Sequence, residues 1–385
     1  MGDFVFSMDA HVIEPRTLFA ERLPEAMKDR GPKAERKDGY LNIICDNKIV
    51  HRMNMGDGYH GQERHGGVQP NLDPRLKDMA QDGIHAEVIY PTSGGVPYLV
   101  EDPELKIACS RIYNDWCIET FKPHPHRFVP TAVLPVAPGT IAQATAELER
   151  CIKLGYRSAL VPCVLPEGLK FNGNDLDPLW ALAQEAGIPI SWHVGTGSSP
   201  VYERGPGGAV INYVEVGNSA QRAVFQMVCG GVLERFPNLQ MVTVEAGASW
   251  LAFLCERMDE VYRAHQFYVK PKLSMMPSEF VKRQVSCTFQ FDRACIMSRS
   301  VTGVKPLLWA ADYPHLEGTF PHSQKVIQGI FQGIDISAED RAAILGGNAA
   351  KLFKIDIARS LADAQITAAR LSAGAEADPA SLTAL

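Results

Sequence analysis

Short apolar or β-branched runs alternate with longer amphipathic stretches along the chain between residues 75 and 355. Runs of about four to eight such residues are typical of buried strands, and apolar residues spaced three and four apart are typical of helices. Together with one run near the N-terminus, we expect eight strands, at residues 4–8, 86–90, 127–134, 157–161, 188–192, 239–244, 285–289 and 306–311. Eight strands that are each followed by a helix predict an α/β fold, the (β/α)8 TIM barrel. A doubly wound sheet is the alternative, but no Gly-x-Gly-x-x-Gly motif follows any of the runs.

The segment between the first strand and the first predicted helix is the one large irregularity. It covers roughly sixty residues, about 16–71, which is longer than a barrel loop requires. Residues 39–52 predict a strand, a turn at Asp46-Asn47 and a second strand, so we expect an inserted β-ribbon at the barrel mouth. The Gly- and His-rich residues 56–67 predict a mobile loop that could act as a lid. We therefore expect one barrel domain over residues 1–358 and an Ala-rich tail over 359–385, helical at first and frayed from about residue 372.

The composition is that of a globular protein and excludes several functional classes. The formal net charge is −6, and no basic run offers a footprint for nucleic acid phosphates. No stretch approaches the ~20 apolar residues of a membrane span, and the first residues do not resemble a signal peptide. The nine cysteines are scattered without any Cys-x-x-Cys and do not resemble a disulfide framework. We expect a reduced, cytoplasmic protein that acts on a small molecule and binds neither nucleic acid nor a membrane.

Four side chains that ligate metals close three of the apolar runs: Asp9, His11, His193 and Asp312. Residues i and i+2 of an extended chain point to the same side, so Asp9 and His11 should face the barrel axis together. A parallel α/β barrel places its active site at the carboxyl ends of its strands. Two imidazoles and two carboxylates suit Zn²⁺ or Mn²⁺. Each residue has a structural alternative. Asp9 and His11 could form a turn or a cap, and His193 could be a buried structural histidine. Asp312 could cap the turn at 312–315.

Further polar and aromatic residues are candidates for substrate binding. They are His60 and Arg64 on the insertion, His315 and Glu317 after the last strand, and the aromatic Trp192 and Tyr313 near the mouth. Each group has an alternative role. His60 and Arg64 could lie on a solvated loop, and His315 and Glu317 could only hold the last loop in place. The aromatic residues could serve in ordinary packing. The aromatic residues favour an aromatic or apolar substrate.

Several segments resemble the amidohydrolase-related family, the branch of the amidohydrolase superfamily that includes aminocarboxymuconate-semialdehyde decarboxylase and γ-resorcylate decarboxylase. The matching segments are residues 9–15, 75–79, 83–91, 113–116, His193, 245–250, 309–320 and 344–350. The resemblance implies one divalent ion at the mouth of a barrel, bound by Asp9 and His11 of strand 1 and His193 of strand 5. It also implies that Asp312 of strand 8 binds the metal and handles a proton. No lysine ends strand 4, which favours one metal over two.

The main departure from the family pattern is on strand 6. The decarboxylases resembled here carry a histidine that shuttles a proton to the leaving carbon, and this chain has Glu245 instead. A carboxylate could join the metal shell, or act as an acid or base if its pKa is raised, but it cannot be a cationic donor. The alternatives for Glu245 are a cap for the helix that begins near Ser249, or a salt-bridge partner.

These observations favour a metal-dependent hydrolase that uses a metal-activated water on a small, aromatic or apolar carbonyl substrate. We expect Zn²⁺ first and Mn²⁺ second, with Asp312 taking the proton of the water and Glu245 returning one to the leaving group. The first alternative is a metal-dependent, non-oxidative decarboxylase of an aromatic or dienoic acid. The second is a catalytically inactive barrel that acts as a binding protein. The resemblance also implies a homodimer or higher homo-oligomer.

Overall fold

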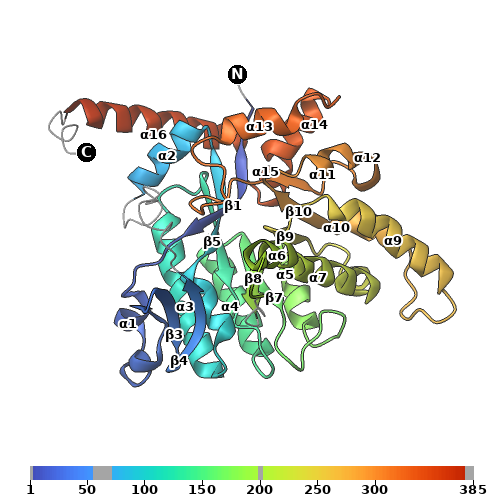
Figure 1. Cartoon of the computed structure of the whole chain (residues 1–385), viewed down its shortest axis with the longest axis horizontal. Helices are drawn as coiled ribbons and strands as arrows, with labels where there is room; N and C mark the ends of the chain where they lie inside the picture. The colour runs from blue at the N-terminus through green and yellow to red at the C-terminus, as the bar shows by residue number, and fades with distance from the viewer. Residues whose placement is uncertain (1–2, 55–71, 198–202, 378–385) are drawn as a thin grey trace.

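The computed structural model describes residues 3–54, 72–197 and 203–377. Within these residues, eight parallel strands follow one another around a barrel in the order β1-β5-β6-β7-β8-β9-β10-β11 (Figure 1). Their bounds are β1 (Phe6–Val12), β5 (Ala86–Pro91), β6 (Phe128–Val133), β7 (Ser158–Val164), β8 (Ile190–Gly197), β9 (Met241–Val244), β10 (Val285–Phe289) and β11 (Leu307–Trp309). The predicted (β/α)8 barrel is confirmed.

The barrel is closed by contacts between the last strand segment and the first. An isolated parallel bridge joins Ala10 to Tyr313. The amide of Asp312 donates to the carbonyl of Asp9 at 2.9 Å, and the amide of His11 donates to the carbonyl of Tyr313 at 2.6 Å. The hydrogen bonds that close the barrel therefore involve the backbone of three predicted metal ligands, Asp9, His11 and Asp312.

Helices follow the strands along the chain and surround the sheet (Figure 1). The longer ones are α2 (Asp73–Asp82), α3 (Pro103–Phe121), α4 (Ile141–Leu154), α5 (Asp177–Ala186), α6 (Gly208–Glu215), α7 (Asn218–Cys229), α9 (Trp250–Ala264), α10 (Pro277–Gln284), α13 (Ser323–Phe331) and α16 (Ile357–Ala377). The shorter ones are α1 (Leu18–Arg22), α8 (Val232–Arg235), α11 (Arg293–Met297), α12 (Arg299–Thr302), α14 (Ala338–Ala342), α15 (Asn348–Leu352), the 3₁₀ helices η1 (Glu25–Arg30) and η3 (Ser93–Leu99), and the π-helical turn η4 (Ala343–Gly347).

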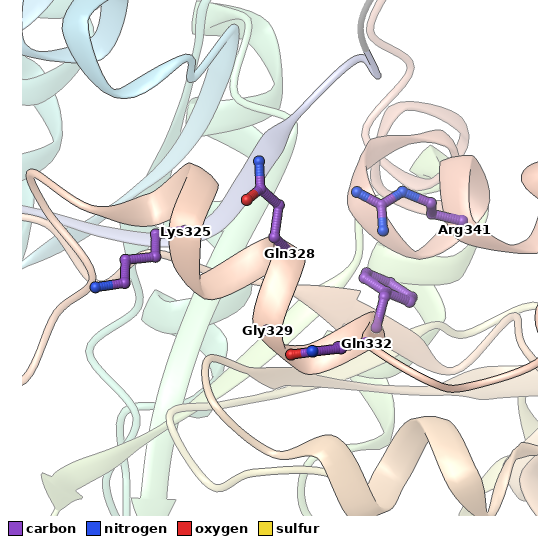
Figure 2. Close-up of a pocket in the computed structure, with 6 residues that line it drawn as sticks. Lys325, Gln328, Gly329, Gln332 and Arg341 are labelled. Carbon is purple, nitrogen blue, oxygen red and sulfur yellow. The ribbon is translucent and has the colours of Figure 1, made fainter.

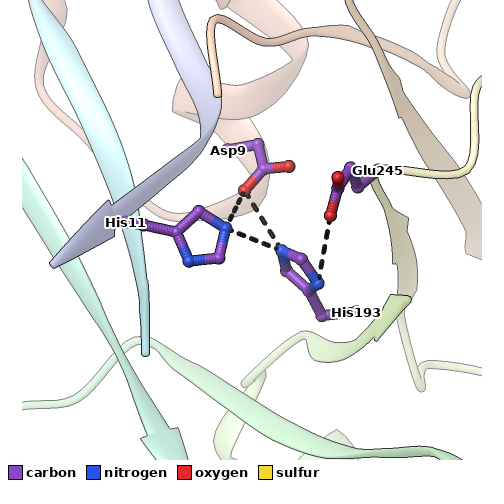
Figure 3. Close-up of side chains that lie close together, drawn as sticks. All are labelled: Asp9, His11, His193 and Glu245. Carbon is purple, nitrogen blue, oxygen red and sulfur yellow. Dashed lines mark hydrogen bonds and ion pairs between the residues drawn. The ribbon is translucent and has the colours of Figure 1, made fainter. Parts of the chain in front are cut away.

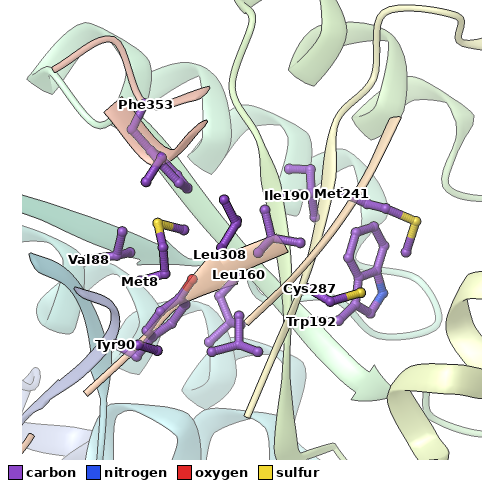
Figure 4. Close-up of a cluster of buried hydrophobic side chains, with 14 of the residues drawn as sticks. Met8, Val88, Tyr90, Leu160, Ile190, Trp192, Met241, Cys287, Leu308 and Phe353 are labelled. Carbon is purple, nitrogen blue, oxygen red and sulfur yellow. The ribbon is translucent and has the colours of Figure 1, made fainter. Parts of the chain in front are cut away.

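The strands are buried on both faces, because one face lines the barrel and the other is covered by helices. All seven residues of β1 are buried, as are all six of β5. Figure 4 shows part of this core, with Met8, Val88, Leu160, Ile190 and Leu308 contributed by five different strands. Burial of each such side chain contributes about 1.5–3 kcal/mol relative to leaving it in water. The result is a rigid frame for the strand ends.

The insertion after β1 contains a three-stranded antiparallel sheet of β2 (Lys33–Lys37), β3 (Tyr40–Cys45) and β4 (Lys48–Asn54). The predicted ribbon corresponds to β3 and β4, and their turn residues Asp46 and Asn47 have φ of 52° and 60°, as a two-residue hairpin turn requires. The sequence prediction missed β2, whose residues are all exposed and show no apolar alternation. The predicted loop at 56–67 lies outside the described residues.

The C-terminal helix α16 extends to Ala377, beyond the predicted fraying point near residue 372. It packs against the barrel: Ser360 donates to the carbonyl of His85 at 3.2 Å, and Arg370 pairs with Asp73 of α2. The division of the chain at residue 358 stays a prediction.

The nine cysteines form no disulfide, as expected, and all but Cys229 are buried. Among the described helices, none is long and apolar enough to cross a membrane. The cytoplasmic location stays a prediction.

Candidate metal centre

Three of the predicted metal ligands lie within strands. Asp9 and His11 belong to β1, and His193 belongs to β8, whereas we expected each to lie just past its strand. The sequence boundary was placed where the apolar run ends, but parallel pairing continues beyond it, with His11 opposite Tyr90. Asp9, His11 and His193 are only 1%, 3% and 5% exposed, so these polar groups are enclosed in the barrel.

The side chains of Asp9, His11 and His193 converge on one point (Figure 3). The Nε2 atoms of His11 and His193 are 3.0 Å apart, and Oδ1 of Asp9 lies 3.5 Å from the first and 3.4 Å from the second. Oδ1 of Asp312 lies 3.6 Å from Nε2 of His11. Adjacent ligands of a Zn²⁺ ion with bonds of about 2.0–2.1 Å are about 2.9–3.4 Å apart. The spacing therefore matches a mononuclear site.

Hydrogen bonds fix the tautomers of both imidazoles. Nδ1 of His11 lies 3.0 Å from the carbonyl of Pro91, and Nδ1 of His193 lies 2.8 Å from the carbonyl of Val194. A carbonyl only accepts, so each Nδ1 carries a hydrogen, and the two Nε2 atoms face each other. A proton on His193 or a metal ion can therefore lie between the two Nε2 atoms, which are 3.0 Å apart. This arrangement is the one expected of metal-binding histidines.

Carboxylates supply the remaining donors: Asp9 and Glu245 group with the two histidines, and Asp312 groups with His11 and His315. Neither carboxylate oxygen of Asp9 or Asp312 accepts a well-oriented hydrogen bond from a described residue, although both side chains are at most 1% exposed. Buried carboxylates without hydrogen-bond donors are costly unless a positive charge lies close by. A donor set of two imidazoles and two carboxylates fits a divalent ion such as Zn²⁺ or Mn²⁺.

Electrostatic conditions differ among these groups. Burial lowers the pKa of His11 well below its ordinary value. Burial also disfavours charge on His193, but the carboxylates of Asp9 and Glu245 outweigh it and raise the pKa of His193 to about 9. Burial raises the pKa of Asp9, and it raises the pKa of Glu245 to about 8. The cluster is thus short of positive charge, which is the condition that favours binding of a cation.

Glu245 directly follows β9 and points into the cluster, with Oε2 3.7 Å from Nδ1 of His193. It does not cap α9, because the carboxylate of Asp292 accepts from the amides of Ala248 and Ser249 at 2.8 and 2.7 Å. The capping alternative is therefore wrong. No local pattern points to Asp292, since its role depends on the loop after β10 reaching the start of α9.

Both carboxylates that follow strands have left-handed backbone conformations. The φ angle is 62° for Glu245 and 55° for Asp312. Such a conformation costs a non-glycine residue about 1–3 kcal/mol and is found mainly where function requires it. Hydrogen bonds hold both: Glu245 donates its amide to the hydroxyl of Thr288 at 2.9 Å, and Asp312 donates to the carbonyl of Asp9.

His315 and Glu317 extend the cluster toward the mouth. The ring of His315 stacks on that of His11 with centroids 4.1 Å apart, and its Nδ1 lies 3.0 Å from Oδ1 of Asp312. One potential ligand atom each from Glu245, Asp312, His315 and Glu317 lies within 4.8 Å of the others. These two substrate-binding candidates are therefore brought to the site.

Trp192 and Tyr313 are not brought there. Trp192 lies on the opposite side of β8 from His193, where it packs between Phe171 and Trp180 with ring centroids 5.7 and 5.8 Å away. The hydroxyl of Tyr313 donates to Oδ2 of Asp78 at 2.6 Å, away from the metal ligands. His60 and Arg64 lie outside the described residues.

Tyr90 is a site residue that sequence reasoning missed. Its ring centroid lies 5.1 Å from that of His193 and 6.3 Å from that of His11. Its hydroxyl pairs with that of Ser191 at 3.0 Å. The alternation of side chains along β5 could have placed it on the inner face, although not beside these two histidines.

A separate hollow lies on the outer surface between α13 and α14 (Figure 2). It is lined by Lys325, Gln328, Gly329, Phe331, Gln332 and Arg341. None of these residues was predicted to take part in chemistry.

A family model for amidohydrolases matches residues 72–355. The chain is 24% identical over 303 residues to 2-amino-3-carboxymuconate-6-semialdehyde decarboxylase of Dictyostelium discoideum, covering 74% of this chain and 77% of the relative. It is 24% identical over 297 residues to γ-resorcylate decarboxylase of Rhizobium sp., covering 74% of this chain and 87% of the relative. A decarboxylase of Emericella nidulans is 32% identical over 146 residues, which are 36% of this chain and 43% of the relative.

Solved structures share the fold. An amidohydrolase from Mycobacterium avium subsp. paratuberculosis has a TM-score of 0.74 at 21% identity, covering 93% of this chain and 100% of the other. The 5-carboxyvanillate decarboxylase from Sphingomonas paucimobilis has a TM-score of 0.68 at 21% identity, covering 92% and 100%. A dihydroxybenzoic acid decarboxylase from Polaromonas sp., solved with bound manganese, has a TM-score of 0.63 at 19% identity, covering 92% and 97%.

The relatives overturn the expectation of a hydrolase. The three curated relatives named above are decarboxylases, and two of them match about three quarters of the chain, at 74% each. The expectation was wrong because it gave too much weight to Glu245 in place of histidine. A metal with two imidazoles and two carboxylates can activate water or hold a substrate, so the ligand set does not distinguish hydrolysis from decarboxylation.

Proposed function

The chain belongs to the amidohydrolase family, and from this premise we propose that it is a metal-dependent, non-oxidative decarboxylase of a small aromatic or dienoic acid. The observation that carries the proposal is the convergence of His11, His193 and Asp9 on one buried point, with Asp312 3.6 Å from His11, in a chain that is similar to curated decarboxylases.

The proposed cofactor is one divalent ion, Zn²⁺ or Mn²⁺. Manganese is bound in the Polaromonas decarboxylase of similar fold, and the mixed nitrogen and oxygen donors here suit either ion. When bound, the ion supplies a fixed positive charge that attracts substrate oxygens and stabilises the negative charge of the transition state. Asp9, His11, His193 and Asp312 would hold it.

Decarboxylation breaks the bond between the carboxylate and the substrate carbon, leaves the electron pair on that carbon, and requires one proton to replace the lost CO₂. Asp312 and Glu245 are the two carboxyl groups positioned to hold and deliver this proton. Glu245 stands where the resembled decarboxylases have a histidine, and Oε2 lies 3.7 Å from the His193 ring. The imidazole of His315, 3.0 Å from Asp312, can exchange a proton with that carboxylate.

The substrate would enter from the side of His315 and Glu317. His315 is about a third exposed, at 30%, whereas Asp312 beneath it is fully buried, at 0%. His315 therefore lies between the proposed metal ligands and the outside, where its imidazole can hydrogen-bond to an acidic substrate. We assign these two residues to substrate binding on that basis.

The function can be tested by incubating metal-loaded protein in D₂O with a panel of ortho-hydroxylated benzoic acids and dienoic acids. We expect CO₂ release and one deuterium at the carbon that lost the carboxylate. Asp312→Asn should lower the rate of both signals by about 10²-fold or more. Incorporation of solvent oxygen into a product, without CO₂, would contradict decarboxylation.

A further inference from the structure

Helix α2 carries a pair of buried side chains, Arg75 and Asp78, which the proposed reaction does not use. They belong to one of the segments that resemble the family, residues 75–79. We propose that Arg75 and Asp78 are positioning residues, which fix the two chain segments that present His11 and Asp312 to the metal. This inference rests on the proposed metal site.

Arg75 holds the end of β1. The side chain is only 1% exposed, and its Nη1 donates to the carbonyl of His11 at 2.7 Å. Its Nε donates to the carboxylate of Glu87, also at 2.7 Å, in a pair that is excluded from water. A guanidinium has a planar fork, and with one arm fixed on Glu87 of β5 the other arm has a defined direction. Arg75 therefore fixes the position of the His11 backbone relative to β5.

Asp78 holds the segment that follows β11. It lies one helical turn after Arg75 on the same face of α2, and its Oδ2 accepts from the hydroxyl of Tyr313 at 2.6 Å. Tyr313 is the residue next to Asp312, and its ring also lies under the Arg75 guanidinium, 5.0 Å from the centroid. The hydroxyl and the ring of Tyr313 are thus both held by α2.

The segment held by Arg75 and the segment held by Asp78 contact each other where the barrel closes. The amide of His11 donates to the carbonyl of Tyr313 at 2.6 Å, so the peptide groups on both sides of His11 are fixed. Asp312 has a φ of 55°, a conformation that persists only where its surroundings hold it. If Tyr313 is released, Asp312 can relax toward an ordinary backbone conformation and move its carboxylate away from the histidines. Loss of outer partners of metal ligands typically costs about 10–100-fold in metal affinity.

Tyr313→Phe tests this inference, because it removes one hydroxyl and keeps the aromatic ring. Tyr156→Phe is a matched control: Tyr156 is also buried, and its hydroxyl donates to the carbonyl of Asn114 at 2.6 Å, on α3. We would measure the Kd for Zn²⁺ by competition with a chromophoric chelator, and the stability of each metal-free protein by urea unfolding.

Both variants should lose similar stability without metal. Tyr313→Phe should in addition bind Zn²⁺ about tenfold more weakly, whereas Tyr156→Phe should match the wild type. A purely structural role for Tyr313 would lower stability and leave the Kd unchanged, which would overturn the inference. If the wild-type protein itself takes up no metal, the proposed function fails, and the positioning role fails with it.

Discussion

His11 and His193 approach each other within 3.0 Å through their Nε2 atoms, although 182 residues separate them in the chain. Each ring donates its Nδ1 hydrogen to a backbone carbonyl, so the two Nε2 atoms face each other across the site. A proton or a metal ion can be shared between two nitrogen atoms at this distance. The first prediction follows from this relationship.

His193→Ala should lose the bound metal, because the ion would keep only one imidazole and the buried carboxylates. Protein purified without chelator should contain about one Zn or Mn per chain, by inductively coupled plasma mass spectrometry, and the variant almost none. His124→Ala is the control. His124 pairs with Asp363 of α16 and belongs to none of the groups of potential metal ligands among the described residues. Equal metal content in all three proteins would place the ion elsewhere.

Metal should also stabilise the fold. A ligand that binds only the native state raises the free energy of unfolding by about 2.7 kcal/mol when its free concentration is 100 times Kd. Thermal unfolding of wild-type protein with Zn²⁺, with Mn²⁺ and with chelator should show this shift. The shift should be absent in His193→Ala, and a shift of equal size in the variant would contradict the assignment of His193.

Asp312→Asn should reduce turnover by about 10²-fold or more, because the amide cannot carry the proton that a general acid delivers. Asparagine tolerates the left-handed conformation that Asp312 adopts, with φ of 55°, so the barrel should fold normally. The measurement is the rate of CO₂ release beside far-ultraviolet circular dichroism. A turnover within a few-fold of wild type would remove Asp312 from the proposed chemistry.

Glu245→Gln should also lower turnover, by about 10²-fold, if Glu245 delivers the proton in place of the histidine of related decarboxylases. Glu317→Gln is an informative comparison, because Glu317 lies in the same cluster but is exposed and should affect KM more than kcat. Separate measurement of kcat and KM for both variants distinguishes the two roles. A pure KM effect in Glu245→Gln would make it a binding residue.

Glu147 gives a prediction for stability against pH that does not depend on the metal. Burial alone would raise the pKa of this carboxyl, but hydrogen bonds from Arg150 and Asn114 outweigh it and hold the pKa below the ordinary 4.5. A lowered native pKa contributes stability above pH 4.5, and this contribution is lost as the pH falls through the native value. Glu147→Gln should therefore cost about 1–3 kcal/mol at pH 7 and less near pH 3, below the ordinary pKa.

Urea unfolding at the two pH values would check this. The control is Glu149→Gln on the same helix, because Glu149 pairs with Lys153 at the surface, where 56% of its side chain is exposed. That variant should change stability little at either pH. A Glu147→Gln defect that is the same at pH 7 and pH 3 would show that the stabilisation does not depend on charge.

Local patterns in the sequence determined much of this protein. Alternating runs predicted the barrel, because strand and helix periodicities depend only on neighbouring residues. The i, i+2 spacing placed Asp9 and His11 on one side of β1, and Asp46-Asn47 predicted a hairpin turn with positive φ at both residues. A second turn at Asp38-Gly39, with φ of 52° and 78°, could have revealed β2 in the same way.

Tertiary structure alone decided how the strand ends meet. Closure between Ala10 and Tyr313 sets the position of Asp312 beside His11, and no local pattern specifies that register. The same holds for Arg75 at the carbonyl of His11, and for Asp292, which caps α9 in place of Glu245. These contacts join segments far apart in the chain, so they depend on barrel geometry and packing and not on the residues beside them in sequence.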